Sequence, residues 1–142
     1  MRKLEILVVD DDLDLADMLG ALLEGEGHTV DVVYSGEEAL DFLRRYPYQM
    51  VVLDMVLPGI DGLQIYETVS RHETAGRHET AGRHETEGCH PDAPLYVFID
   101  DRPFDRLPDA CVGLVRPFDP RRLIHLASAR ASDGFTTLGY SP

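Results

Sequence analysis

Apolar and polar positions along the chain form two alternating kinds of segment. Short apolar runs rich in β-branched residues predict five strands, over residues 4–9, 29–34, 50–53, 95–99 and 111–115. Apolar residues at helical spacing predict helices over residues 13–24, from Ser35 to Pro47, from Leu63 onward and over residues 120–129. This alternation predicts an α/β fold with a parallel sheet, right-handed crossovers and strands buried on both faces.

Local signals mark the ends of two of these helices. Gly25 and Gly27 follow the first helical segment, and we expect them to stop it. Ser35, with Glu38 three residues later, matches the capping box that opens a helix.

Residues 71–88 break the pattern, because they contain three copies of a hexapeptide, RHETAG twice and then RHETEG. The segment has almost no apolar surface, so it cannot form a core of its own. We expect the third helix to run a turn or two past Ser70 and to be followed by a polar excursion to about Asp92. Such an insertion is tolerated at the surface, because the entropy of loop closure grows slowly with length.

The repeat also places histidines six residues apart. These histidines form neither an HExxH motif nor a Cys2His2 spacing, which favours solvated side chains over metal ligands. They are His72, His78, His84 and His90.

Length and composition narrow the class of protein. The 142 residues predict a single domain over residues 1–130, with the repeat inserted at about 71–90 and a tail over 131–142. A formal net charge of −13 argues against direct binding of nucleic acid, which needs Lys and Arg at the phosphates. There is no signal-peptide pattern and no bilayer-spanning apolar run, so we expect a cytoplasmic protein without a membrane partner. Cys89 and Cys111 are expected to be ordinary thiols.

Candidate chemistry gathers where predicted strands end. Asp54 closes the third strand, just before the loop that contains Pro58 and Gly59, and residues 10–12 are three acids that follow the first strand. The carboxyl ends of strands in an open α/β sheet are where ligands bind. Acids from two such ends can converge on one hard cation, which prefers oxygen ligands. A cation of this kind can assist phosphoryl transfer to a carboxylate, and Arg116 after the fifth strand could reach the phosphoryl oxygens.

Three motifs together resemble the receiver domain of two-component response regulators. They are VVDDD at 8–12, VVLDMVLPGIDG at 51–62 and VRPF at 115–118. The resemblance covers residues 4 to about 130, with the repeat as an insertion. It implies a doubly wound, flavodoxin-like fold with a five-stranded parallel sheet in the order 2-1-3-4-5 and five helices.

The resemblance also implies roles for individual residues. Asp54 would be the phosphoacceptor and a ligand of Mg²⁺, or of Mn²⁺ in its place. Asp11 would bind the metal directly and Asp10 mostly through water, while Val56 would contribute its backbone carbonyl. Arg116 would stabilise the phosphoryl group.

The family's partners are implied in the same way. We expect a histidine kinase or phosphotransfer protein as donor and a downstream protein as target, and a homodimer is also compatible with the sequence. The protein would not be an enzyme beyond accepting the phosphoryl group and slowly losing it. The third acid, Asp12, is expected at the rim of the site and not among the ligands.

The sequence departs from the family pattern around the fourth and fifth strands. The family usually has Ser or Thr where Ile99 or Asp100 stands, and neither can donate a hydroxyl hydrogen bond to a phosphoryl group. Arg116 replaces the usual Lys with a planar fork, and Gly113 stands where an aromatic switch residue is common. The segment from Asp100 to Arg116 is short and contains two prolines, so we expect at most a shortened fourth helix.

Two functions therefore compete. One is a receiver that is phosphorylated on Asp54, and the other is an atypical pseudo-receiver that works as a phosphorylation-independent protein-interaction module. A phosphatase of the haloacid-dehalogenase type is disfavoured, because it needs a second Asp where Val56 stands. The sequence fits both a stand-alone receiver and part of a longer regulator.

Overall fold

The computed structural model describes residues 2–78 and 93–132, with side chains described in the first range as far as Arg71. Nine helices and strands follow one another in these two ranges. They are β1 (Glu5–Val9), α1 (Leu13–Gly25), β2 (Thr29–Val33), α2 (Gly36–Arg45), β3 (Met50–Asp54), α3 (Gly62–His78), β4 (Leu95–Asp100), β5 (Cys111–Val115) and α4 (Arg121–Ala131).

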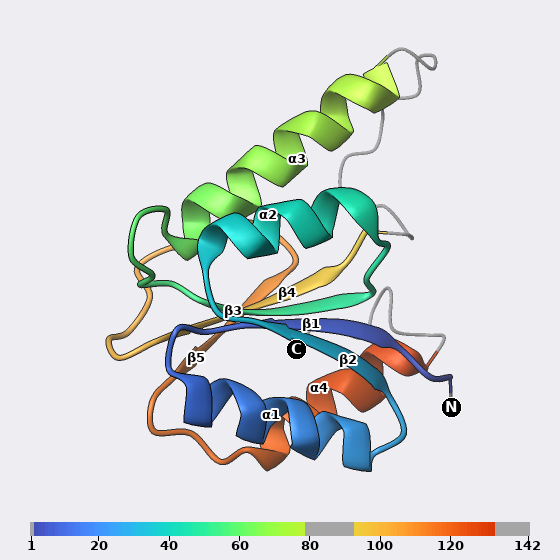
Figure 1. Cartoon of the computed structure of the whole chain (residues 1–142), viewed down its shortest axis with the longest axis vertical. Helices are drawn as coiled ribbons and strands as arrows, with labels where there is room; N and C mark the ends of the chain where they lie inside the picture. The colour runs from blue at the N-terminus through green and yellow to red at the C-terminus, as the bar shows by residue number, and fades with distance from the viewer. Residues whose placement is uncertain (1, 79–92, 133–142) are drawn as a thin grey trace.

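The five strands form one parallel sheet in the order β2-β1-β3-β4-β5 (Figure 1). This confirms the expected fold class and strand order. In the ladder, Val9 pairs with Leu53, and Asp54 pairs with Ile99. Strands β1, β3 and β4 therefore end at the same edge of the sheet, and the acids that end or follow them lie along that edge.

Helices cover both faces of the sheet, with α1 and α4 on one side and α2 and α3 on the other (Figure 1). Successive side chains of a strand point to opposite faces. Accordingly, Ile6 and Val8 pack in the cluster that contains α1 and α4, whereas Leu7 and Val9 pack in the cluster that contains α2 and α3. Every residue of β3 is buried, which fixes the position of its terminal Asp54.

The residues predicted to begin α2 and to end α1 lie at those helix ends and have the expected conformations and hydrogen bonds. The Glu38 backbone N–H donates to the Ser35 hydroxyl over 3.2 Å, as the capping box requires. The Glu38 carboxylate accepts from the backbone N–H of Tyr34, one residue before the cap, over 2.9 Å. At the end of α1, Gly27 has a φ of +100°, a conformation that glycine adopts without strain.

Helix α3 carries the beginning of the repeat. It is described as far as His78, so it runs at least about two turns past Ser70. The predicted polar excursion to about Asp92 lies outside the described residues, as do the side chains of the four spaced histidines.

The connection between β4 and β5 corrects one expectation. No helix forms over the described residues 101–110, so the shortened fourth helix is absent and four helices are seen in the described part of the chain. Pro103 and Pro108 each lack an N–H and restrict the backbone, which disfavours a helix over so short a span. Phe104 and Leu107 instead pack against the sheet on the side of α2 and α3.

The last helix is fixed to the edge of the sheet opposite the acids. Arg130 is buried, and its Nε and Nη2 donate to the carbonyls of Gln49 and Ala93, each over 3.0 Å. Among the described residues, no helix combines the length and apolar character needed to cross a membrane.

Candidate functional site

Three acids converge at the carboxyl edge of the sheet, as the sequence predicts. Asp10 follows β1, Asp11 is the next residue, and Asp54 ends β3. Each can offer one carboxylate oxygen such that all three oxygens lie within 4.8 Å of one another. Asp10 and Asp54 are 2% and 3% exposed, whereas Asp11 lies at the surface.

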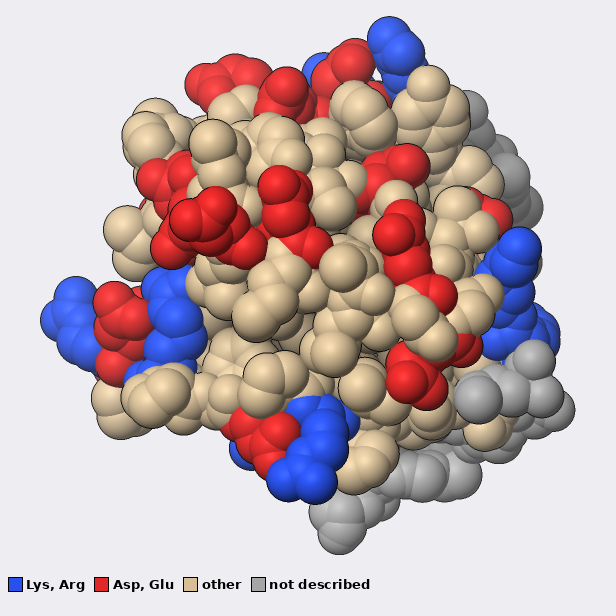
Figure 2. Space-filling view, turned by 60° about the horizontal axis from the view of Figure 1, so that its bottom comes forward, with Lys and Arg blue, Asp and Glu red and all other residues tan. Residues whose placement is uncertain are grey.

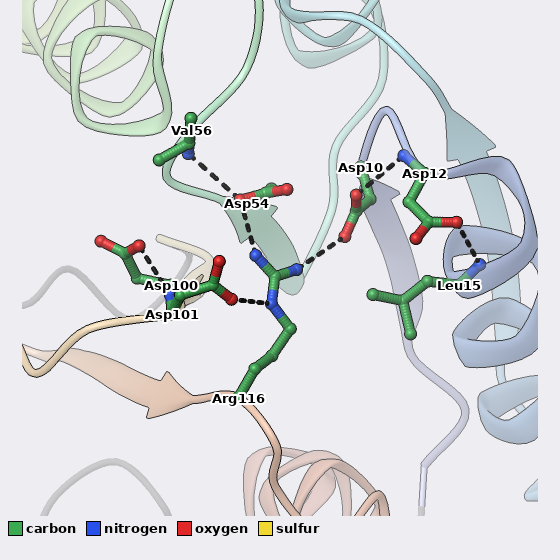
Figure 3. Close-up of polar contacts among 8 residues, drawn as sticks. All are labelled: Asp10, Asp12, Leu15, Asp54, Val56, Asp100, Asp101 and Arg116. Carbon is green, nitrogen blue, oxygen red and sulfur yellow. Dashed lines mark hydrogen bonds and ion pairs between the residues drawn. The ribbon is translucent and has the colours of Figure 1, made fainter.

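Backbone N–H groups orient the two buried carboxylates (Figure 3). The N–H of Asp12 donates to Asp10 Oδ1 over 3.0 Å, and the N–H of Val56 donates to Asp54 Oδ1 over 3.1 Å. The carboxylate of Asp12 accepts from the N–H of Leu15 over 3.2 Å and caps α1. Asp12 therefore has a structural role beside the cluster, and it is not one of the three converging acids.

The burial of this cluster distinguishes it from the general acidity of the protein. Figure 2 shows Asp and Glu side chains spread over the face that it draws, with Lys and Arg in small separate groups. Acids of that kind are stabilised by water. Asp10 and Asp54 have lost most of their hydration, so their charges must be stabilised by groups within the protein or by a bound cation.

Arg116 is the basic residue that reaches both buried acids. It follows β5, and its guanidinium lies between the ends of β1 and β3 (Figure 3). Its Nη1 is 3.6 Å from Asp10 Oδ2 and its Nη2 is 3.7 Å from Asp54 Oδ1. These contacts are ion pairs that exceed hydrogen-bond length, so Arg116 compensates the acids only in part.

The pKa values of the two acids reflect this incomplete compensation. Burial raises the pKa of Asp54 to about 7, and the neighbouring charge of Asp10 adds to the rise. The Val56 N–H and the Arg116 charge act in the opposite direction without cancelling it. Burial likewise raises the pKa of Asp10.

One carboxylate oxygen of the cluster lacks a hydrogen-bond partner. Asp10 Oδ2 is buried and has no hydrogen-bond partner. An orphaned carboxylate oxygen next to two other acids is a set of hard donors, which fits a hard divalent cation such as Mg²⁺ better than a soft metal.

Ile99, one of the residues considered for the switch positions, pairs with Asp54 in the β3–β4 ladder, but its side chain has no hydrogen-bond donor. Ile99 is buried in the sheet, and the Asp100 carboxylate turns away from Arg116 to accept from the N–H of Asp101 over 2.7 Å (Figure 3). The carboxylate of Asp101, which sequence reasoning did not single out, does reach Arg116, since Arg116 Nε donates to its Oδ1 over 2.8 Å.

A second residue that sequence reasoning missed fills the space above Gly113. A Cβ on Gly113 would come within 2.5 Å of the Phe104 ring, so the missing side chain makes room for that ring. An aromatic residue is thus present at this place, supplied by the β4–β5 connection and not by β5. The available signal was a glycine inside a strand, which often marks close approach of another group.

A parallel sheet of this order, with buried acids after β1 and β3 and a basic residue after β5, is the architecture of a receiver domain. The family model of the response regulator receiver domain matches residues 6–80. The chain belongs to this family of two-component signalling proteins.

Individual relatives agree with this assignment. The chain is 45% identical over 65 residues to the DNA-binding response regulator MtrA of Mycobacterium tuberculosis, a match that covers 46% of this chain and 28% of MtrA. It is 34% identical over 67 residues to the regulatory protein VanRc of Enterococcus gallinarum, covering 47% and 29% of the two chains. The matched segment is thus less than a third of these relatives' length.

Solved structures show the same fold at low sequence identity. A Francisella response regulator receiver domain superposes with a TM-score of 0.69 at 19% identity, covering 91% of this chain and 97% of that one. The signal receiver domain of a LuxO repressor protein from Vibrio parahaemolyticus gives 0.71 at 17% identity, covering 92% and 91%.

Proposed function

We propose that this receiver accepts a phosphoryl group on Asp54 from a histidine kinase or phosphotransfer protein in the bacterial cytoplasm, and passes the signal to a protein target. The observation that carries the proposal is the convergence of Asp10, Asp11 and Asp54 within 4.8 Å at the carboxyl edge of the sheet. Asp54 is the last residue of the fully buried strand β3, and its carboxylate lies 3.7 Å from the Arg116 guanidinium.

Mg²⁺, or Mn²⁺ in its place, is the proposed cofactor. Asp10, Asp11 and Asp54, with the backbone carbonyl of Val56, would hold it, and the orphaned Asp10 Oδ2 supports this assignment. When bound, such an ion offsets the repulsion between the carboxylates and an incoming phosphoryl group.

The residues of the chain then have distinct tasks in the transfer. An oxygen of the ionised Asp54 forms a bond to phosphorus while the bond from phosphorus to the donor's imidazole nitrogen breaks, and the imidazole leaves with that electron pair. The Val56 N–H, 3.1 Å from Asp54 Oδ1, orients the acceptor. The Arg116 guanidinium lies beside Asp54, where it can stabilise the negative charge of the phosphoryl oxygens.

Incubation with a small phosphodonor and Mg²⁺ tests the proposal. We expect intact-mass analysis to show one added phosphoryl group on the wild type, peptide mapping to assign it to Asp54, and Asp54→Asn to remain unmodified. The matched control is Asp61→Asn, which changes an acid at the same edge outside the cluster and should leave the modification intact. No modification of the wild type, or modification that survives in Asp54→Asn, would refute the assignment.

A phosphorylation-independent interaction module is the second candidate. It is favoured by the end of β4, where neither Ile99 nor Asp100 offers a hydroxyl, and by the β4–β5 connection, where no helix forms over the described residues 101–110. Amide hydrogen exchange before and after treatment with beryllofluoride and Mg²⁺ separates the two functions. Binding at Asp54 with no change in exchange over residues 100–116 favours the second candidate, and a change there favours a phosphorylation switch.

A further inference from the structure

The shortest side-chain contact of Arg116 is not with the acids of the site. Its Nε lies 2.8 Å from Asp101 Oδ1, whereas its Nη atoms lie 3.6 Å from Asp10 and 3.7 Å from Asp54. The first distance is that of a charge-assisted hydrogen bond, and the other two are too long for one. Arg116 is therefore held most closely by a residue outside the acidic cluster.

The backbone after β4 directs Asp101 toward this contact. The N–H of Asp101 donates to the Asp100 carboxylate over 2.7 Å, and the N–H of Arg116 donates to the Asp100 carbonyl over 2.9 Å. These bonds fix the ends of the β4–β5 connection beside each other. The Asp101 carboxylate then faces the guanidinium, while that of Asp100 points away (Figure 3).

An arginine suits this arrangement because its donors point in different directions. One guanidinium can give its Nε–H to Asp101 and still direct two Nη groups toward Asp10 and Asp54. A lysine at position 116 carries all its donors on a single nitrogen, so it cannot bind Asp101 through one nitrogen while it directs others toward Asp10 and Asp54.

We propose that Asp101 is a positioning residue, which holds the guanidinium of Arg116 back from Asp10 and Asp54 and so keeps these acids open to a cation. The inference rests on the proposed function, because it takes Mg²⁺ as that cation. Without Asp101, the guanidinium would move onto the two buried acids and hydrogen-bond to them directly. It would then compete with Mg²⁺ for the same oxygens.

Calorimetric titration with Mg²⁺ alone tests the proposal. We expect Asp101→Ala to weaken Mg²⁺ binding by about tenfold, the equivalent of one charge-assisted hydrogen bond gained by the competing guanidinium. Asp101→Asn keeps an acceptor oxygen and should recover part of the lost affinity. Asp105→Ala removes an exposed acid from the same connection and should leave the affinity within about twofold of the wild type.

A double-mutant cycle with Arg116→Met separates positioning from simple charge removal. If Asp101 acts through Arg116, Asp101→Ala should have no further effect on Mg²⁺ affinity once position 116 is Met. A loss of the same size in both backgrounds would overturn the proposal and show that Asp101 acts only by its own charge.

A measurement without metal provides an independent readout. The Nε–H of Arg116, assigned by its disappearance in Arg116→Met, should exchange with water more slowly in the wild type than in Asp101→Ala. Equal exchange in the two proteins would contradict the bond on which the proposal depends. If the wild type does not bind Mg²⁺, the proposed cofactor and this role are both overturned. If the wild type binds Mg²⁺ and Asp101→Ala binds it with the same affinity, this role alone is overturned.

Discussion

The substitution Asp54→Asn removes the charge of a buried acid while leaving its shape almost unchanged. Asp54 is 3% exposed, and its nearest cationic group is 3.7 Å away. The amide oxygen of Asn can still accept from the Val56 N–H, so the backbone geometry of the loop should survive. The variant therefore isolates the free energy of holding this carboxylate ionised inside the protein.

The size of the effect follows from the pKa of Asp54, which burial raises from 3.8 to about 7. Between these values the folded protein keeps a proton that the unfolded chain has released, so the free energy of unfolding falls as the pH rises through this interval. The whole interval corresponds to about 4 kcal/mol. Because the buried amide of Asn carries a desolvation cost of its own, we expect a net gain of about 2 kcal/mol at about pH 8. For a chain of this length that is roughly 6 °C in Tm.

Urea unfolding followed by circular dichroism, repeated from about pH 8 down to about pH 5, measures this effect. The advantage of Asp54→Asn should be largest at high pH and shrink as the pH falls, because the wild type then protonates Asp54. Millimolar Mg²⁺ at about pH 8 should stabilise the wild type more than the variant and narrow the gap. A variant that is less stable at about pH 8, or a difference that does not depend on pH, would refute the reasoning. The exposed Asp105, changed to Asn, should show no comparable trend.

Three further substitutions, the first with a matched control, test other parts of the structure. Gly62→Ala places a Cβ within 2.6 Å of the Asp54 carbonyl, so we expect a loss of about 1–3 kcal/mol in urea unfolding, while Gly25→Ala, with open space around it, should be neutral or stabilising. Equal midpoints for the two variants would contradict this packing. Arg130→Met removes the Arg130 donor from the Ala93 carbonyl and one of the two donors from the Gln49 carbonyl, which also accepts from the Leu95 N–H. The variant should lose about 2 kcal/mol, which an unchanged Tm would disprove. His28 accepts from the Leu4 N–H, and burial lowers its pKa, so its contribution to wild-type stability should decline as the pH falls below about 6.5, opposite in sign to that of Asp54. The difference in stability between the wild type and His28→Gln should therefore shift against the wild type as the pH falls, and a difference that does not depend on pH would contradict this role.

The fold could be predicted from the sequence because its main signals are strong and local. The apolar run at 50–53 and the strict helical spacing at 13–24 each permit one structure, and the observed elements agree within one or two residues. The acids of the site were predictable for a related reason. A residue at the carboxyl end of a parallel strand is positioned by the strand itself, so Asp10 and Asp54 could be placed once their strands were identified.

The rest of the site depends on a connection that has no periodic pattern. Asp101 is one of several acids in a polar segment, and its partner Arg116 lies fifteen residues away in the sequence. Phe104 could have been a solvent-exposed loop residue, and only the packing of the folded chain places it over Gly113. Contacts of this kind arise from tertiary structure, which hydrophobic spacing does not encode.

The departures from the family pattern around β5 are connected with one another in space. Arg116 in place of the usual Lys provides the Nε that Asp101 binds, and Gly113 in place of an aromatic residue leaves the space that Phe104 fills. Both compensating side chains come from the same helix-free connection. Restoring a single position to the family pattern should therefore disturb this region: an aromatic residue at 113 would collide with Phe104, and a lysine at 116 would leave Asp101 without the Nε–H that it binds. The backbone N–H groups that orient the acids at the ends of β1 and β3 take part in neither contact, so this region could diverge while the backbone of the acidic cluster kept its geometry.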